Sequence, residues 1–232
     1  MNTYQKVLIC GFPHCGTSIL KSIIGHIDDV YEILDESAII THESVKSGKK
    51  FILCKWPFTI NDFFDKKYKD FIKIFIIRNP LFAFSSLDKR FESNIPNDHN
   101  FACYVNTLQK FIKYKNNPEK DIYTIRYEDL FENNYNELKK ILNDIGFRYD
   151  DSIFDNNKYT NVHLTGVDIL DSKPDIVDGT YHSHYRTWQI NQPFVLNNDI
   201  SKIKLNEAQI EEIVNDHYVL QIYPDIKSII TS

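Results

Sequence analysis

Residues 11–18, GFPHCGTS, form a glycine-rich stretch directly after the apolar run KVLIC at 6–10. They match the phosphate-binding pattern G-x-x-x-x-G-K-[ST] except that Thr17 stands where the lysine belongs. Glycine lets the chain turn tightly, so successive main-chain N–H groups are expected to point at an anion at the start of a helix. The residues expected to present them are Cys15, Gly16, Thr17 and Ser18. A plain glycine turn that binds nothing is the alternative.

The missing lysine changes the ligand that this loop suits. In P-loop enzymes that hydrolyse ATP, the lysine neutralises the β- and γ-phosphates, and the hydroxyl that follows it holds magnesium. Thr17 weakens both functions. The loop therefore predicts an anionic ligand other than ATP with magnesium.

A second candidate anion site follows the apolar run FIKIFII at 71–77. Arg78 comes where a buried strand would end, Asn79 can cap the next helix, and Pro80 fits a first helical turn. A guanidinium in this position can bind a terminal phosphate through two parallel hydrogen bonds, with Ser86 donating beside it. An ion pair at the helix start is the other interpretation of Arg78.

These stretches together resemble the sulfotransferases that use 3′-phosphoadenosine 5′-phosphosulfate (PAPS). GFPHCGTS is similar to their 5′-phosphosulfate loop, P-[KR]-S-G-T-[ST], and RNPLFAFSS at 78–86 is similar to their 3′-phosphate motif, R-[DN]-P-x-x-x-x-x-S. RYEDL at 126–130 resembles the segment whose tyrosine, here Tyr127, lies near the adenine. The resemblance covers residues 6–130 and is faint beyond them. It implies transfer of a sulfuryl group, which carries a single negative charge and in this family needs no metal.

The resemblance also implies catalytic residues. LCKWPF at 53–58 looks like the K-x-P-F stretch of tyrosylprotein sulfotransferases, which implies that Lys55 stabilises charge in the transition state. Those enzymes place a glutamate shortly after the first helix, and EILDES offers Glu36 as the general base, with Asp35 as the alternative. A solvated lysine and a surface carboxylate are the plainer interpretations of Lys55 and Glu36.

His14 is a departure from the family, which has lysine or arginine at this position. A histidine beside a polyanion is favoured in its charged form, so the resemblance implies a weaker and pH-dependent cation. The alternative is a loop that has lost this function or serves a different one.

Near the other end of the chain, YRTW at 185–188 resembles the segment that folds over the 3′-phosphate and adenine, which implies roles for Arg186 and Trp188 in donor binding. Three histidines lie near it, at His163, His182 and His184. A zinc site and an exposed loop feature are the two interpretations, and H-x-H without a clear third ligand favours the loop. No metal is predicted.

Composition limits the class of protein. The chain has 232 residues, with 27 basic and 32 acidic side chains and a formal charge of −5, which argues against a general nucleic-acid binder. No apolar run has the length of a membrane span or a signal peptide, so no membrane partner and a cytoplasmic location are expected.

The four cysteines form no C-x-x-C pair and are expected to be reduced packing residues. The sequence predicts no oligomeric state.

The spacing of apolar residues predicts the elements that carry these side chains. Short apolar runs alternate with helix-period segments, which is typical of an α/β protein, here a P-loop-type three-layer fold with a central, mainly parallel sheet flanked by helices. Helices are expected at 18–27 and 135–145, and from Asn206 onward. One domain, 1–232, is predicted, with an irregular and functional stretch at 147–199.

The predicted function is transfer of a sulfuryl group from PAPS to a hydroxyl or amine by in-line displacement. The acceptor is a small molecule, a carbohydrate or a peptide, expected to bind between residues 36–50, 92–102 and 147–186. A degenerate P-loop nucleotide kinase is one alternative. A non-catalytic protein that binds PAPS or its product, 3′-phosphoadenosine 5′-phosphate (PAP), is the other.

Overall fold

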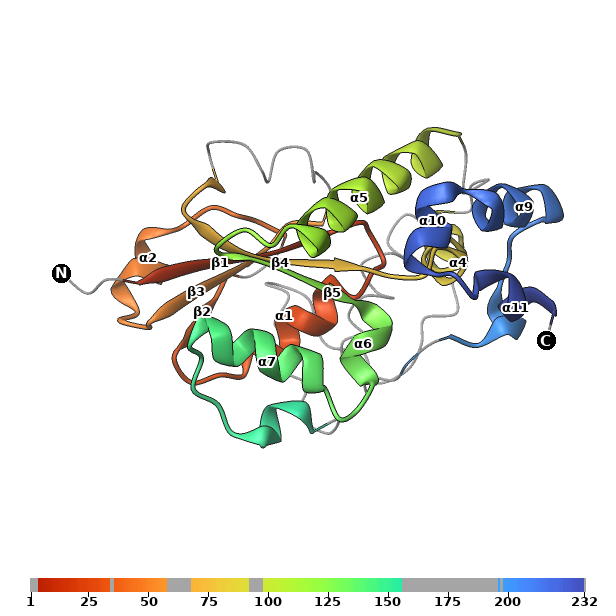
Figure 1. Cartoon of the computed structure of the whole chain (residues 1–232). Coiled ribbons are helices and arrows are strands. Elements are labelled where there is room, and N and C mark those ends of the chain that lie inside the picture. The colour runs from red at the N-terminus through yellow and green to blue at the C-terminus, as the bar shows by residue number, and fades with distance from the viewer. Residues whose placement is uncertain are drawn as a thin grey trace.

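A computed structural model describes residues 4–33, 36–57, 68–91, 98–155, 196 and 198–231, without the side chains of 88–91 and 98–99. Within these residues lies a five-stranded sheet of order β2-β3-β1-β4-β5, in which every pairing is parallel. Helices flank it (Figure 1). The predicted α/β fold with a mainly parallel sheet is confirmed.

The strands coincide with the apolar runs of the sequence. A parallel strand covered on both faces is apolar throughout, so it appears as a continuous run and not as an alternation. The observed strands are β1 (Gln5–Gly11), β2 (Val30–Glu32), β3 (Phe51–Lys55), β4 (Phe71–Ile77) and β5 (Ile122–Arg126). The runs KVLIC and FIKIFII lie within β1 and β4, whereas β2 has only three residues, too few to form a pattern.

Two apolar layers cover the sheet, one on each face. Val7 and Ile74 pack under α1 (Thr17–Gly25), α6 (Tyr127–Phe131) and α7 (Asn136–Ile145), whereas Leu8 and Phe75 pack with α5 (Asp98–Asn116). Neighbouring residues of one strand thus pack into cores on opposite faces of the sheet, because successive side chains of a strand point to opposite sides.

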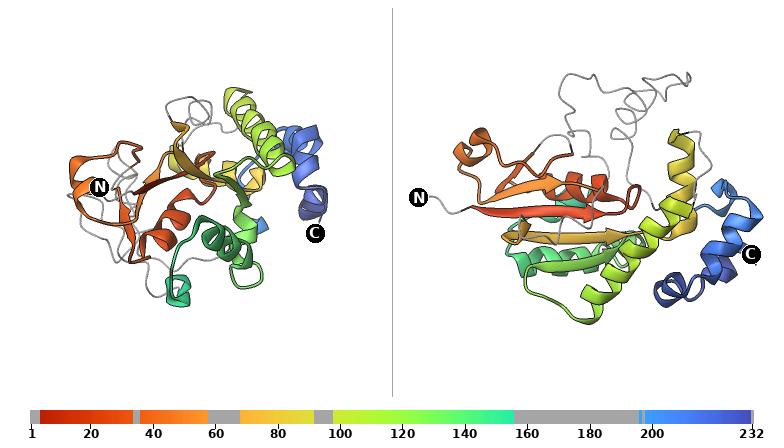
Figure 2. Two further views of the ribbon diagram at one scale, coloured as in Figure 1. Left: turned by 60° about the vertical axis from the view of Figure 1, so that its left-hand side comes forward. Right: turned by 90° about the horizontal axis from the view of Figure 1, so that it is seen from above.

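The remaining longer helices lie past the carboxyl end of β4 (Figures 1 and 2). They are α4 (Pro80–Phe91), α9 (Glu207–Asn215), α10 (His217–Ile222) and α11 (Ile226–Thr231). The described residues also contain the short helices α2 (His42–Lys46), η2 (Asp151–Phe154) and η4 (Ile200–Lys202).

Helix ends follow the predicted signals at Asn79 and at the end of α7, whereas α1 ends at Gly25, two residues before its predicted end. The Asn79 side chain accepts a hydrogen bond from the Leu81 N–H at 3.0 Å, and α7 ends at Gly146, whose φ is 88°. The helix predicted to start after Asn206 does start there but divides into α9 and α10. Asp216 is the cause, because its backbone is extended and its carboxylate caps α10.

The strand order places the candidate residues together. β1 is central; the chain crosses from it to the edge strand β2, returns to β3 beside β1, and then forms β4 and β5 on the other side of β1. In such sheets, ligands bind outside the carboxyl ends of the strands, at the point where the order reverses. Three candidate features lie at this edge: the loop after β1, Lys55 at the end of β3, and Arg78 after β4.

Residues 156–195 lie outside the described structure, so a single domain stays a prediction. Among the described helices, none has the length and apolarity needed to cross a membrane.

Candidate anion-binding site

The loop between β1 and α1 depends on its two glycines. A Cβ on Gly11 would lie 2.1 Å from the Ile76 carbonyl oxygen, and a Cβ on Gly16 would lie 2.5 Å from a ring carbon of Tyr127. Gly16 also has a φ of 95°, in the left-handed region. α1 starts at Thr17, and the first N–H groups of a helix have no acceptor within it. The loop therefore ends in a helix N-terminus suited to an anion.

Cys15 differs from the expectation for this loop. Its N–H donates to the Phe12 carbonyl at 3.3 Å, inside the loop's own turn, and its thiol is buried. Burial raises the pKa of the Cys15 thiol above its ordinary value. Thr17 is buried as well, whereas Ser18 is exposed and carries the accessible hydroxyl.

His14 joins the two motifs that the sequence separates by more than sixty residues. Its Nδ1 lies 2.9 Å from the Ser86 Oγ, and its carbonyl oxygen accepts a hydrogen bond from Arg78 Nη1 at 3.4 Å. His14 has a φ of 64°, a left-handed conformation that is uncommon outside glycine. The loop after β1 and the turn after β4 are thus in direct contact.

Arg78 is held against an aromatic ring. Only 5% of its surface is exposed, and its guanidinium carbon lies 4.3 Å from the centre of the Tyr127 ring. Tyr127 is itself 3% exposed and packs closely against Gly16. The Tyr127 ring therefore packs against the Arg78 guanidinium. That Tyr127 lies near an adenine stays a prediction.

Lys55 connects the other candidate catalytic residues. It is 2% exposed, and its Nζ donates to the Ser18 Oγ and to the Glu36 Oε1, each at 2.9 Å. The predicted lysine, the predicted base and the loop hydroxyl thus form one contact chain. Asp35, Arg186, Trp188 and the three histidines at 163, 182 and 184 lie outside the described residues.

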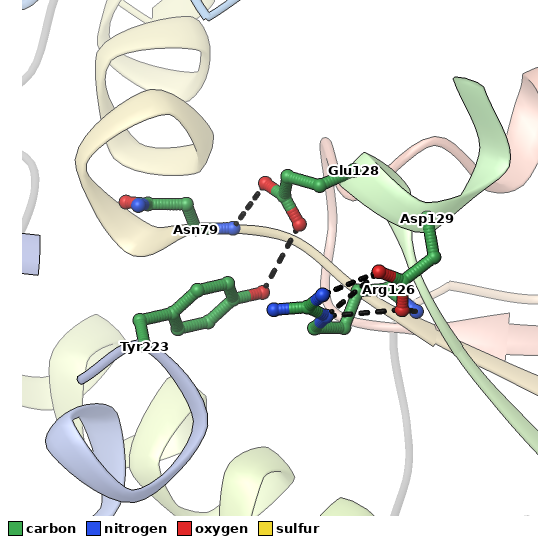
Figure 3. Close-up of polar contacts among 5 residues, drawn as sticks. All are labelled: Asn79, Arg126, Glu128, Asp129 and Tyr223. Carbon is green, nitrogen blue, oxygen red and sulfur yellow. Dashed lines mark hydrogen bonds and ion pairs between the residues drawn. The ribbon is translucent and has the colours of Figure 1, made fainter. Parts of the chain in front are cut away.

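Three residues of this region were not anticipated from the sequence. Tyr104 donates a hydrogen bond to the Arg78 carbonyl oxygen, and Glu128 accepts one from the Asn79 N–H at 2.9 Å. The Tyr223 hydroxyl donates to Glu128 at 3.4 Å (Figure 3). Glu128 lies inside the RYEDL motif, directly after Tyr127, so the motif could have identified it as a candidate site residue. Tyr104 and Tyr223 are aromatic residues in apolar helix faces and carry no such signal.

Two cations lie at this edge, each near a carboxylate: Lys55 pairs with Glu36, and Glu128 accepts a hydrogen bond from the Asn79 N–H next to Arg78. Lys55 and Arg78 lie beside the loop of a chain whose formal charge is −5, and both are nearly buried. Buried cations interact strongly with an anion because little water screens them. Within the described residues, no group of three or more His, Cys, Asp or Glu side chains is arranged to hold a metal ion. The arrangement suits an extended anion with charge at two ends.

Solved sulfotransferases resemble this structure. Mouse sulfotransferase SULT7A1 complexed with PAP is 18% identical with a TM-score of 0.48, and the alignment covers 64% of this chain and 60% of the mouse chain. The sulfotransferase domain of the Synechococcus PCC 7002 olefin synthase is 13% identical with a TM-score of 0.48, covering 84% of this chain and 90% of that domain. The sulfotransferase domain from the curacin biosynthetic pathway is 11% identical with a TM-score of 0.48, covering 97% and 98% respectively. No protein-family model and no curated protein matches the sequence. At these identities and TM-scores the similarities assign no function.

Proposed function

We propose that this protein is a sulfotransferase that moves a sulfuryl group from PAPS to a hydroxyl or amine. The observation that carries the proposal is the meeting of three strand ends at one loop. His14 contacts Arg78 and Ser86 on one side, and Ser18 contacts Lys55 on the other. The residues expected to bind the two charged ends of the donor therefore share one edge of the sheet.

The two charged ends of the donor would bind to different residues of the site. The N–H groups at the start of α1, the Ser18 hydroxyl and the His14 imidazole would hold the 5′-phosphosulfate. Arg78 and Ser86 would bind the 3′-phosphate, since a guanidinium can donate two parallel hydrogen bonds to a terminal phosphate. A sulfuryl group carries less charge than a phosphoryl group, which suits a loop that has Thr17 in place of lysine.

Transfer would use Lys55 and Glu36. The acceptor oxygen or nitrogen attacks sulfur, the bond from sulfur to the 5′-phosphate oxygen breaks, and PAP leaves. Glu36 takes the acceptor's proton, and Lys55 stabilises the charge that develops on the bridging oxygen. In the structure the two side chains are paired at 2.9 Å, so donor binding at Lys55 would also release Glu36 for the acceptor.

Nucleotide binding is the first test. We expect PAP to raise the melting temperature more than ATP with magnesium does, because Arg78 and Ser86 are proposed to bind a 3′-phosphate, which ATP lacks. The reverse order would contradict the proposal and favour a kinase. A kinase of this fold needs a lysine in the loop and a carboxylate for magnesium after a later strand, whereas the loop has Thr17, β3 ends at Lys55 and β4 is followed by Arg78.

A non-catalytic PAP- or PAPS-binding protein is the second candidate, and the replacement of the family's basic residue by His14 favours it. Both candidates predict PAP binding. Transfer of labelled sulfate from PAPS to a panel of small-molecule, carbohydrate and peptide acceptors separates them. Transfer to any acceptor supports the enzyme, and PAP binding without transfer to any of them supports the binding protein.

A further inference from the structure

The peptide group that joins Arg78 to Asn79 is held from both sides by side chains, one buried and one partly buried. Its C=O accepts a hydrogen bond from the Tyr104 hydroxyl, and its N–H donates to Glu128 Oε1 at 2.9 Å. Both bonds lie on one planar unit, so together they fix the rotation of that plane. This unit is the one from which the Arg78 side chain leaves the end of β4.

The two side chains come from different elements. Tyr104 lies on α5 and is fully buried, and Glu128 lies on α6 next to Tyr127, whose ring carries the Arg78 guanidinium. Glu128 is supported in turn by the Tyr223 hydroxyl from the end of α10 (Figure 3). The main chain at Arg78 is therefore fixed by three helices that are far apart in the sequence.

Burial makes these two bonds hard to break. Tyr104 is fully buried and Arg78 and Asn79 are nearly so, so turning the peptide would leave its C=O and N–H without partners where water has little access. The same turn carries the start of α4, because the Asn79 side chain caps the Leu81 N–H. A rotation here would thus displace Arg78 and also shift Ser86, which lies further along α4.

We propose that Tyr104 and Glu128 are positioning residues that orient Arg78 toward the terminal phosphate of the nucleotide. The inference rests on the proposed function, since it takes the 3′-phosphate as the group that Arg78 binds. Neither residue contacts the ligand. They act through the peptide at the end of β4 and set how much the 3′-phosphate contributes to binding.

The test measures that contribution directly. Calorimetry gives the dissociation constants of PAP and of adenosine 5′-monophosphate, which lacks the 3′-phosphate, and their ratio reports what the 3′-phosphate adds. Tyr104→Phe removes the hydroxyl that holds the C=O and keeps the ring. Glu128→Ala removes the acceptor, and Glu128→Gln keeps a carbonyl oxygen for the Asn79 N–H. Tyr218→Phe removes a hydroxyl from a partly buried tyrosine of α10 and serves as the matched control.

The ratio is expected to fall at least about fivefold in Tyr104→Phe and Glu128→Ala, and to stay within about twofold in Glu128→Gln and Tyr218→Phe. A ratio that stays within twofold in Tyr104→Phe, or an equal loss for both nucleotides, would show a purely structural role and overturn the inference. An equal fall in Glu128→Gln and Glu128→Ala would also overturn it, because charge and not the hydrogen bond would then be decisive. If Glu128→Ala does not fold, Tyr104→Phe decides. A wild-type protein with no preference for PAP would instead refute the proposed function, and the inference with it.

Discussion

The Lys55 ammonium lies 2.9 Å from the Glu36 carboxylate, and both belong to the edge of the sheet where the candidate donor loop begins. Lys55 has almost no exposed surface, whereas the Glu36 side chain is 23% exposed. The carboxylate can therefore reach solvent and an acceptor while the lysine stays fixed by Ser18. This pair is the natural first target for mutagenesis.

Glu36→Gln is expected to abolish most of the transfer and leave donor binding nearly intact. Loss of a positioned general base costs about a hundred- to ten-thousandfold in rate, whereas the amide can still accept a hydrogen bond from Lys55. Single-turnover transfer of labelled sulfate and calorimetry with PAP measure the two effects. Glu43→Gln, at an exposed position on α2, is the control. Unchanged transfer in Glu36→Gln would exclude Glu36 as the base.

Arg78→Ala is expected to raise the dissociation constant of PAP by about tenfold or more. A charge-assisted hydrogen bond contributes roughly 1.5–3 kcal/mol, and tenfold corresponds to about 1.4 kcal/mol. Arg148→Ala removes an exposed arginine that follows α7 and should leave PAP binding unchanged. Equal PAP affinity in the two variants would remove Arg78 from the site.

His14→Arg is expected to remove a loss of activity in mildly alkaline buffer. An imidazole becomes neutral as the pH rises past neutrality, whereas a guanidinium keeps its charge, so only the wild type should lose attraction for the phosphosulfate. The measurement is transfer rate and PAPS affinity between about pH 6 and pH 9. The hypothesis fails if the two proteins have the same pH profile.

Gly16→Ala is expected to destabilise the protein more than Gly48→Ala. Both glycines have positive φ, 95° and 73°, so both substitutions strain the backbone by roughly 1 kcal/mol. Only Gly16 would also place its Cβ 2.5 Å from the Tyr127 ring, while Gly48 has no heavy atom within 4 Å. Overpacking of this kind adds about 1–3 kcal/mol. Urea unfolding measures the difference, and equal losses would argue against the close contact with Tyr127.

Glu128→Gln is expected to change how stability depends on pH. Burial raises the pKa of Glu128 in the folded protein, so the folded state binds this proton more tightly than the unfolded state. The contribution of Glu128 to stability is therefore complete below the ordinary value near 4.5 and is lost as pH rises through the raised value. The free energy of unfolding of the wild type, minus that of Glu128→Gln, should fall as the pH rises across this window. Urea unfolding at a series of pH values provides the check, and a difference that increases with pH would contradict it.

The sequence by itself determined the sheet and most of the candidate site. Continuous apolar runs such as FIKIFII become strands because both faces of a parallel sheet are covered, and Asn79 and Gly146 act locally, as helix caps do. Lys55 and Arg78 follow strands, and parallel strands bring their carboxyl ends to one edge. Local pattern alone could therefore predict these positions.

Only the tertiary structure decided which side chains meet. His14 with Ser86, Lys55 with Glu36, and Glu128 with Tyr223 join separate elements. Such pairings depend on how helices pack across the sheet, which no local periodicity encodes. The exposure of the two loop hydroxyls was decided in the same way, because packing around the loop buries Thr17 and leaves Ser18 exposed.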